Sequence, residues 1–295
     1  MELFLEQVLN GIGNGVIYAS VALALVLIYR STGLLNFAQG EMALFSTFVT
    51  WWLTDNFGLS IGVAIIVSIA FSFVTGALIE RVLIRPVEAA HNPLNVVIVT
   101  LGMFLAINSI AQLLFGTDPQ KMPSLFPTGK VDLGGIGIRK DTIGLAVVLV
   151  AECLLLYLLL QKTKVGLALR AVASNQDSSR LVGINTGFML MLGWGLAAAL
   201  GSIAGSLVAG TLTGFDASLM AQVLVYSFAA AALGGFDSPM GAVIAGLVVG
   251  VADALTVQYI DALDGINVVV PLGLILIVLL VRPNGLFGRR TVERV

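Results

Sequence analysis

Five polar side chains stand inside long apolar stretches of the sequence, where they could bind a solute, carry a proton or pair with one another. Asn36, Gln39 and Glu41 occur within one six-residue segment, whereas Glu152 and Asp253 are each isolated among apolar neighbours. An acid held among apolar groups needs either a partner inside the protein or water, because an unpaired buried charge is costly. These five residues are therefore the first candidates for a functional site.

The remaining residues show no pattern typical of an enzyme. The chain has one histidine, His91, and one cysteine, Cys153, so Cys/His zinc sites, iron–sulfur clusters and internal disulfides are excluded. The only Gly-Lys pair, Gly129-Lys130, has Ser124 where a phosphate-binding loop needs its first glycine. We predict that the chain is not an enzyme and that it holds no cofactor and no metal.

Composition indicates a membrane protein. Of 295 residues, 58% are apolar and only 11% are charged, with a net charge of -2. A soluble domain carries roughly twice that share of charge. The sequence has no basic run long enough to follow a nucleic-acid backbone, so we expect membrane lipid and no nucleic acid as a partner.

Apolar runs long enough to cross a bilayer recur along the whole chain. A span needs about 20 residues of helix. Segments 34–54 and 218–234 are ambiguous and could cross fully or re-enter on one side, whereas seven runs are plain: 8–29, 61–80, 93–115, 142–161, 186–209, 240–260 and 266–281. The sequence thus predicts an all-α polytopic membrane protein with about 8–9 transmembrane or re-entrant helices. Because the polar stretches between runs are short, one transmembrane domain is expected to occupy residues 1–295.

Basic residues near the ends of the spans predict the orientation. With the amino terminus outside, 11 of the 15 Lys and Arg residues fall on the cytoplasmic side and 4 fall outside. Cytoplasmic loops hold the excess of positive charge, so we predict an external amino terminus and a cytoplasmic carboxyl terminus. Segment 116–141 then becomes the largest extracytoplasmic loop and a candidate docking face.

In a membrane-spanning chain, the five polar residues are candidates for a translocation path. Glycines at 33 and 40 permit a break in the helix, so segment 36–41 is predicted to depart from regular helix and to contact another span. An interfacial helix cap is the alternative for this segment. For Glu152 and Asp253 the alternative is a protonated structural acid. We keep Asn36, Gln39, Glu41, Glu152 and Asp253 as path residues.

The cytoplasmic segment 162–185 is longer than a simple connection between two helices requires. It has 24 residues, whereas such loops commonly need only two to eight. Residues 166–173 predict a short amphipathic helix, and 175–179 predict a second turn that Gly183 closes. We expect this segment to dock a cytoplasmic partner, with Leu167, Leu169 and Val172 facing a groove and with Arg170 and Asp177 at its polar edge. A surface loop without a partner is the alternative. The residues assigned to this coupling role are Gly166, Leu167, Leu169, Arg170, Asn175 and Asp177.

Pairs of glycines four residues apart occur at four places. They are Gly11/Gly15, Gly201/Gly205, Gly210/Gly214 and Gly246/Gly250. Such spacing lets helix backbones approach closely within a membrane. We predict internal helix packing for these pairs, with a subunit interface as the alternative.

Three blocks of sequence carry a resemblance to a known family. Segments 30–41, 163–173 and 234–242, in this order and spacing, resemble the permease subunits of ABC importers for branched-chain amino acids, and in particular the shorter of the two permeases. The resemblance covers nearly the whole chain. Two residues depart from it: Gln39 stands where many relatives have histidine, and Asp237 stands where glycine is usual. Gln39 leaves a related amide or urea importer open.

This resemblance implies a multi-pass permease in the inner membrane of a bacterial cell. It implies a complex with a second permease as a heterodimer, two cytoplasmic ATPase subunits and an extracytoplasmic solute-binding protein. A homodimeric permease is a smaller variation on this arrangement. The competing hypothesis is an ion-coupled secondary transporter or channel, in which Glu41, Glu152 and Asp253 would relay protons or sodium ions. ATP hydrolysis is expected in separate subunits.

Overall fold

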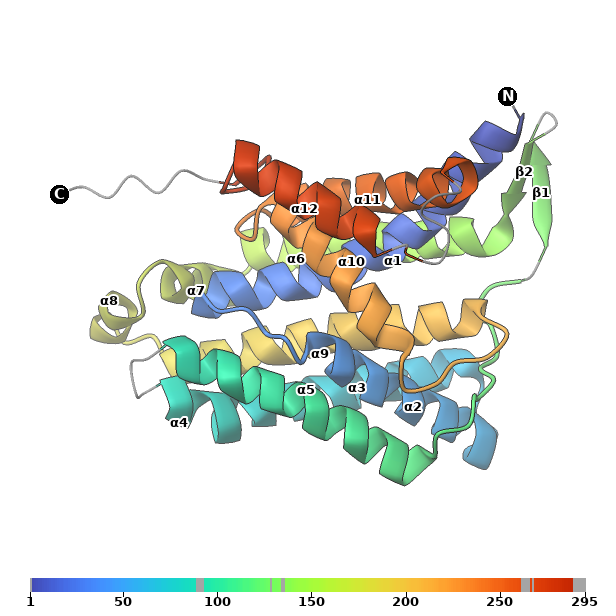
Figure 1. Cartoon of the computed structure of the whole chain (residues 1–295). Helices are drawn as coiled ribbons and strands as arrows, with labels where there is room; N and C mark the ends of the chain where they lie inside the picture. The colour runs from blue at the N-terminus through green and yellow to red at the C-terminus, as the bar shows by residue number, and fades with distance from the viewer. Residues whose placement is uncertain are drawn as a thin grey trace. The chain divides into compact units, whose positions relative to one another are not determined.

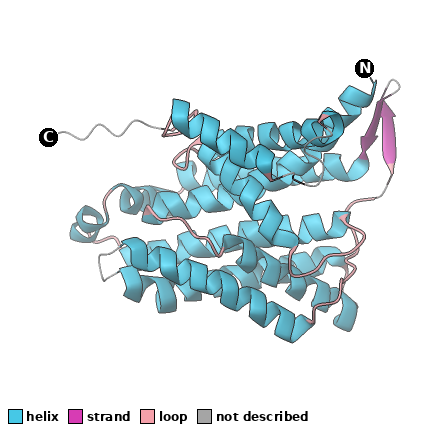
Figure 2. Ribbon diagram, viewed as in Figure 1, coloured by secondary structure: helices cyan, strands magenta, loops and turns pink. Residues whose placement is uncertain are grey.

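A computed structural model describes residues 2–88, 93–127, 129–133, 136–260, 266 and 268–288, and these residues are mostly helical (Figures 1 and 2). His91 lies outside them. The helices are α1 Glu2–Thr32, α2 Gln39–Phe57, α3 Ile61–Ile79, α4 Arg85–Glu88, α5 Pro93–Phe115, α6 Lys140–Lys162, α7 Lys164–Ser174, α8 Gln176–Leu181, α9 Thr186–Thr211, α10 Leu219–Gly234, α11 Pro239–Tyr259 and α12 Val269–Val281. A π-helical turn, η1, joins α3 to α4 over Glu80–Ile84.

Six helices in the described part of the chain are long and apolar enough to cross a membrane. They cover Leu3–Thr32, Ile61–Glu88, Leu94–Phe115, Lys140–Lys162, Thr186–Thr211 and Pro239–Tyr259. The helices α10 and α12 are apolar but shorter, and α12 begins at Val269 rather than at the predicted residue 266. The protein is thus a helical, polytopic membrane protein, while the total of 8–9 crossings and the orientation stay predictions.

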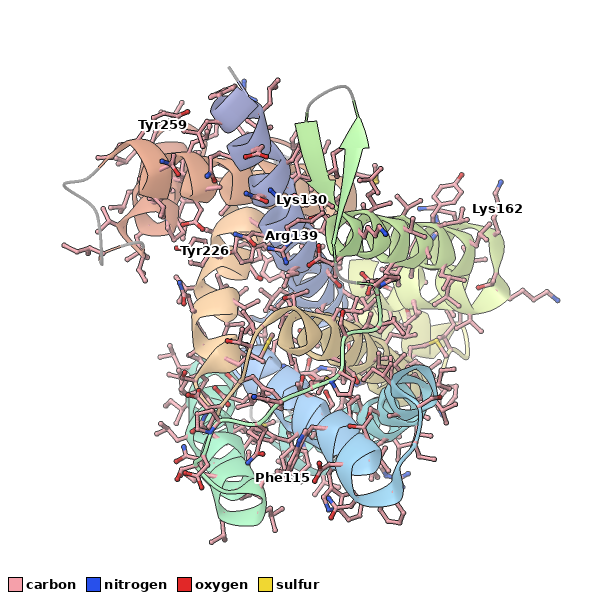
Figure 3. All side chains as sticks on the ribbon, turned by 90° about the vertical axis from the view of Figure 1, so that its right-hand side faces the viewer. Phe115, Lys130, Arg139, Lys162, Tyr226 and Tyr259 are labelled. Atoms are coloured by element: carbon pink, nitrogen blue, oxygen red, sulfur yellow. The ribbon has the colours of Figure 1, made fainter. Side chains whose placement is uncertain are left out.

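A small β-hairpin departs from the all-α prediction. Strands β1, Lys130–Leu133, and β2, Ile136–Arg139, pair antiparallel within segment 116–141, with Lys130 opposite Arg139 (Figure 3). Short runs containing Val and Ile favour an extended backbone. The Lys130 ammonium lies 3.5 Å from Glu6 Oε1, and Arg139 pairs with Asp141. The predicted extracytoplasmic loop is therefore partly ordered by pairing and by charge.

The chain forms two compact units. One contains residues 1–26, 126–149 and 222–295, and the other contains 27–125 and 150–221. Helices α1, α6 and α10 contribute residues to both. The prediction of a single domain over 1–295 stays a prediction.

In the first unit, glycine pairs bring α1 and α11 into close contact. A Cβ atom on Gly15 would lie 2.8 Å from Leu247 Cα, and one on Gly246 would lie 2.7 Å from Ala19 Cα. Only glycine, whose side chain is a hydrogen atom, fits at these separations. Gly11/Gly15 and Gly246/Gly250 thus pack against each other, as predicted for internal contacts.

The glycine-rich turn between α10 and α11 holds the segment that follows α12. The Leu286 amide donates to Leu233 O at 2.8 Å, and the Phe287 amide donates to Gly234 O at 3.2 Å. Gly235 has φ +99°, a backbone conformation that favours glycine. Part of segment 234–242 therefore serves to fasten residues 282–288.

In the second unit, α9 packs against α2 on one side and α3 on another. The Ser72 hydroxyl of α3 donates to Ala198 O at 2.9 Å. Along α2, every fourth residue meets every fourth residue of α9, with a constant separation of 158 in sequence. The facing pairs are Gln39 with Ala197, Ala43 with Gly201 and Thr47 with Gly205. The two helices therefore run parallel, and Gly201/Gly205 is a second internal contact. Gly210/Gly214 is not such a pair, because α9 ends at Thr211.

Candidate functional site

The polar segment before α2 is non-helical only as far as Ala38. Residues 33–38 leave the helix at Gly33, which has φ +73°, and α2 begins at Gln39. The prediction of a break is therefore confirmed for Asn36 and wrong for Gln39, Gly40 and Glu41. The reason is local: the Asn36 side-chain oxygen accepts from the Ala38 amide at 3.0 Å, which starts the helix directly afterwards.

The break lies beside the middle of α9. The Gln39 amide nitrogen donates to Ala197 O at 3.0 Å, and Ala197 is the twelfth of the 26 residues of α9. By the usual rise per residue, Ala197 is about 17 Å from the start of α9. Asn36 and Gln39 are both buried. At such depth an irregular backbone persists only where protein or water satisfies it, so α2 starts inside the bundle rather than at its edge.

Glu41 is held by an amide on α5. Its Oε2 accepts from Asn108 Nδ2 at 2.9 Å, and the same nitrogen donates to Ala217 O, also at 2.9 Å. Gln112 donates to Asn108 Oδ1 at 2.5 Å. Glu41 is fully buried, and within the described chain no group forms a hydrogen bond to its Oε1.

A pocket of about 480 Å³ lies against this group of residues. Its polar lining comes from the start of α2, the second half of α5, the residues just after α5 and the loop before α10. These residues are Glu41, Asn108, Ser109, Gln112, Thr117, Asp216 and Ser218. Two carboxylates face it, and none of the described residues that line it is Lys or Arg.

Sequence reasoning found Glu41 and missed the other residues of this pocket. Asn108 and Gln112 are one helical turn apart within an apolar stretch, so their spacing alone places both amides on one face of α5. The sequence therefore contains enough information to predict that these two amides lie together. The contribution of Asp216 and Ser218 was not, because the return of a loop to α5 depends on tertiary structure.

The other two predicted path acids do not join this pocket. Glu152 lies on the part of α6 that belongs to the second unit. It is buried, but it does not line this pocket. Asp253 belongs to the first unit, where its Oδ1 accepts from the Tyr226 hydroxyl at 2.8 Å. The Tyr18 ring stacks on Tyr226 with centroids 4.7 Å apart. Among the five candidates, the Asn36 amide nitrogen donates to Gln39 Oε1 at 3.5 Å.

The segment 162–185 folds into the two predicted short helices. Thr163 caps α7 by accepting from the Gly166 amide at 2.9 Å, and Asn175 caps α8 by accepting from the Ser178 amide at 2.8 Å. Gly183, with φ +84°, ends the segment. Asn175 is thus placed as a helix cap.

One side of α7 packs against α9 and is not available for a partner. Leu169 and Val172 form a buried cluster with Met189 and Leu190. This corrects the expectation that both would face a groove: residues spaced by three fall on one helix face, and here that face meets α9. Gly166 lies against the Leu160 backbone and is also buried.

The exposed side of α7 and α8 carries a mixed apolar and charged surface. Leu167 is 61% exposed, Leu181 88% and Val182 75%. Asp177 lies 3.7 Å from the Arg180 guanidinium. Arg170 donates to Gln161 Oε1 at 3.0 Å. We call Leu167, Asp177, Arg180, Leu181 and Val182 the exposed α7–α8 surface.

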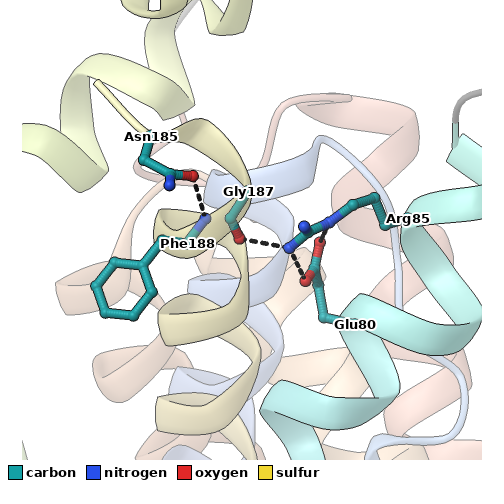
Figure 4. Close-up of polar contacts among 5 residues, drawn as sticks. All are labelled: Glu80, Arg85, Asn185, Gly187 and Phe188. Carbon is teal, nitrogen blue, oxygen red and sulfur yellow. Dashed lines mark hydrogen bonds and ion pairs between the residues drawn. The ribbon is translucent and has the colours of Figure 1, made fainter. Parts of the chain in front are cut away.

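The neighbouring start of α9 is firmly anchored (Figure 4). The Asn185 side chain accepts from the Phe188 amide at 3.0 Å. Arg85 bridges Glu80 Oε2 and Gly187 O, each at 2.7 Å. A force on the α7–α8 segment would therefore meet a rigid support, because η1 and α9 are tied at their ends.

Comparisons with known proteins agree over most of the chain. The family model "Branched-chain amino acid transport system / permease component" matches residues 7–279. The high-affinity branched-chain amino acid transport system permease protein LivH of Salmonella typhimurium is 31% identical, over 99% of this chain and 98% of its own. BraD of Pseudomonas aeruginosa, with the same description, is 30% identical over 99% and 98%. A probable LivH of Methanocaldococcus jannaschii is 27% identical over 96% and 92%. With its apolar helices and these matches, the chain belongs to the family of permease components of branched-chain amino acid transport systems.

Proposed function

We propose that this protein is an inner-membrane permease subunit of an ATP-driven importer for branched-chain amino acids. The observation that carries the proposal is the match of the family model to residues 7–279, together with relatives of the same description that align over nearly their full length. The polar pocket and the exposed α7–α8 surface are the parts of the chain to which we assign the work.

The sequence requires other subunits for this activity. It has no phosphate-binding loop, so ATP must be hydrolysed by partners. We propose two cytoplasmic ATPase subunits, a second permease that makes a heterodimer, and a solute-binding protein that delivers the amino acid at segment 116–141. The predicted orientation, with a cytoplasmic carboxyl terminus, puts the α7–α8 segment on the side of the ATPases.

The polar residues favour a zwitterionic solute with an apolar side chain. Asn36, Gln39, Glu41, Glu152 and Asp253 offer amides and acids, and the predicted path includes no Lys or Arg. A phosphorylated or dicarboxylic solute is itself negative, so the path acids would repel it and no Lys or Arg of the predicted path would pair with it. An apolar amino acid needs only local pairing of its charged ends.

ATP-dependent uptake tests the proposal directly. Proteoliposomes that contain the permeases and ATPases, with the solute-binding protein outside, are expected to accumulate leucine, isoleucine and valine only when ATP is present. Ionophores should have no effect. Uptake that follows an ion gradient without ATP would favour the secondary transporter, and uptake of urea or short amides in place of leucine would favour the related importer.

We assign contact with an ATPase to the exposed α7–α8 surface. Leu167 and Leu181 project from the capped helices α7 and α8, and Val182 directly follows α8, while α7 is backed by α9. A partner can therefore press on these apolar residues without first ordering a loop. Arg180 and Asp177 add charges at its edge. Leu169 supports this surface from inside.

Charge placed on this surface should uncouple the ATPase. We expect Leu167→Asp/Leu181→Asp to leave the permease folded, because both side chains are exposed, and to abolish co-purification of the ATPase subunits. Leu286→Asp, at another exposed leucine, is the matched control. Undiminished co-purification of the double variant would show that the motor binds elsewhere.

A further inference from the structure

The strongest unexplained feature of the second unit is the unsatisfied oxygen of Glu41. The carboxylate is fully buried, its Oε2 is fixed by Asn108, and among the described residues no donor reaches its Oε1. A buried carboxylate oxygen without a donor is costly, and such groups in native proteins call for an explanation. Glu41 lines the 480 Å³ pocket, where a ligand could supply that donor.

The pocket is negative and selects the sign of its ligand. Besides Glu41 it contains Asp216, whose Oδ1 accepts from the Ser218 hydroxyl at 2.6 Å and from the Ser218 amide at 2.8 Å. The Ser218 hydroxyl and then its amide hold the pKa of Asp216 below its usual range, so this loop carboxylate is charged at neutral pH. With no Lys or Arg in the described lining, the pocket attracts cations and repels anions.

The rest of the lining suits a small organic ammonium group. Asn108, Ser109, Gln112 and Thr117 supply oxygen acceptors, while Phe104 and Leu105 supply an apolar wall. A volume of about 480 Å³ is within the range of small-molecule sites. Thr117 and Ser218 are exposed, so the pocket is reached from the end at which α5 stops and α10 starts.

We propose that this pocket is a binding subsite for the α-ammonium group of the transported amino acid, with Glu41 Oε1 as its principal acceptor and Asp216 as a second negative charge. This inference rests on the proposed function. The ammonium donates to Glu41 Oε1 and to neighbouring amide oxygens, and the apolar side chain of the amino acid lies against Phe104 and Leu105. In the predicted orientation the pocket opens toward the solute-binding protein, so it is the first site that the released amino acid meets.

Three probes separate recognition of the ammonium from recognition of the carboxylate. They are leucine, 3-methylbutylamine, which lacks the carboxylate, and 4-methylpentanoate, which lacks the ammonium. Binding is measured by saturation-transfer NMR on the permease–ATPase complex in nanodiscs without the solute-binding protein, with empty nanodiscs as the blank. Leucine and the amine should bind and compete with each other, whereas the acid should not bind. Binding of the acid as strong as that of the amine would overturn the proposal.

Variants locate the site. Glu41→Gln should weaken binding of leucine and the amine about tenfold, as loss of a charge-assisted hydrogen bond predicts. Asp216→Asn keeps an oxygen for Ser218 and should weaken the amine by a smaller factor, so it remains informative if Glu41→Gln fails to fold. Asp55→Asn removes an exposed carboxylate from the same helix, α2, and should bind as wild type. Amine binding unchanged in both pocket variants would overturn the proposal. ATP-dependent leucine uptake by the wild type, measured in parallel, tests the proposed function separately. If the wild type takes up leucine but the variants bind the amine unchanged, only the proposed ammonium subsite is wrong. If the wild type takes up no leucine, the proposed function is wrong.

Discussion

Asp253 shows how a buried acid can serve structure. The carboxylate is buried on α11, it accepts from the Tyr226 hydroxyl at 2.8 Å, and the fully buried Tyr226 ring is stacked on Tyr18. A hydrogen bond of this kind satisfies the acid without water. Asp253 therefore stays a path candidate by prediction only, while its contacts in the first unit fit a structural acid.

Removal of the donor should measure that structural role. Tyr226→Phe keeps the stacked ring and deprives Asp253 of its hydrogen bond, so we expect the free energy of unfolding to fall by about 1–3 kcal/mol. Thermal unfolding of the purified permease checks this value. Tyr259→Phe, at a tyrosine that is 53% exposed, is the control and should change little. Equal stability of the two variants would count against a structural bond.

Glu152 allows a functional test at the same scale. Glu152→Gln replaces the acid with an amide of the same shape, so we expect normal insertion and normal ATP-driven uptake of leucine. Uptake in proteoliposomes, with insertion measured by membrane fractionation, checks this. Loss of uptake together with normal insertion would place the Glu152 charge in the transport cycle.

Single residues of the site could be predicted only in part. Asn36, Gln39 and Glu41 attract attention because polar groups are rare in apolar stretches, and the structure brings all three into the bundle. Their partners could not be foreseen, since Glu41 meets Asn108 from 67 positions away and Gln39 meets Ala197 from 158 away. Such pairings depend on how helices pack, which local sequence does not encode.

At the scale of elements, the parallel contact of α2 with α9 organises the second unit. Gln39, Ala43 and Thr47 lie along one stripe of α2, and they meet the stripe of α9 that contains Gly201 and Gly205. The contact is close because Gly201 and Gly205 have no side chain. Thr50 and Ser206 extend it with a hydroxyl contact of 2.8 Å.

A methyl group should separate these two helices. A Cβ atom on Gly205 would collide with Thr47 Oγ1 and lie 3.0 Å from Ala43 O, so Gly205→Ala should cost about 1–3 kcal/mol of stability. Gly102→Ala on α5 is the control, because no heavy atom lies within 4 Å of that Cβ position. The control should be neutral or stabilising, as alanine favours a helix. We would measure both by thermal unfolding, and a loss of similar size in both variants would refute close packing at Gly205.

Local signals explain which elements could be predicted. The caps Thr163 and Asn175 act within three residues, so α7 and α8 follow from sequence alone. The buried face of α7 did not follow, because Leu167 and Leu169 are equally apolar and only the presence of α9 decides between them. The same limit left α2 ambiguous, since its sequence does not reveal that it begins beside the middle of another helix.

At the scale of the whole molecule, the distribution of charge predicts the orientation. The 11 to 4 excess of Lys and Arg on one side places segment 162–185 in the cytoplasm and segment 116–141 outside. Ser178 and Lys121 are exposed members of these two segments. They offer positions for a direct measurement on the full chain.

Labelling of single cysteines should show on which side of the membrane each of these two segments lies. In a Cys153→Ala background, Ser178→Cys should react with a membrane-impermeant maleimide only in inside-out vesicles, and Lys121→Cys only in right-side-out spheroplasts. The parent without cysteine is the blank. The reverse pattern would invert the topology, and labelling of both positions from one side would mean that the number of crossings between them is even.

The depth at which α2 begins has a consequence for biogenesis. Gln39 and the irregular segment 33–38 are sheltered beside α9, whose residue Ala197 is synthesised 158 positions later. At about 5–20 residues per second, ribosomes need roughly 8–30 s to cover that distance. During this interval α2, which is not among the six described helices that are long and apolar enough to span a membrane, lacks the α9 carbonyl to which its buried Gln39 amide donates. We therefore expect α2 to reach its final position only after α9 has been synthesised, and to stay at the translocon or bound to a chaperone until then. A chain that stops before residue 186 should leave α2 open to added protease.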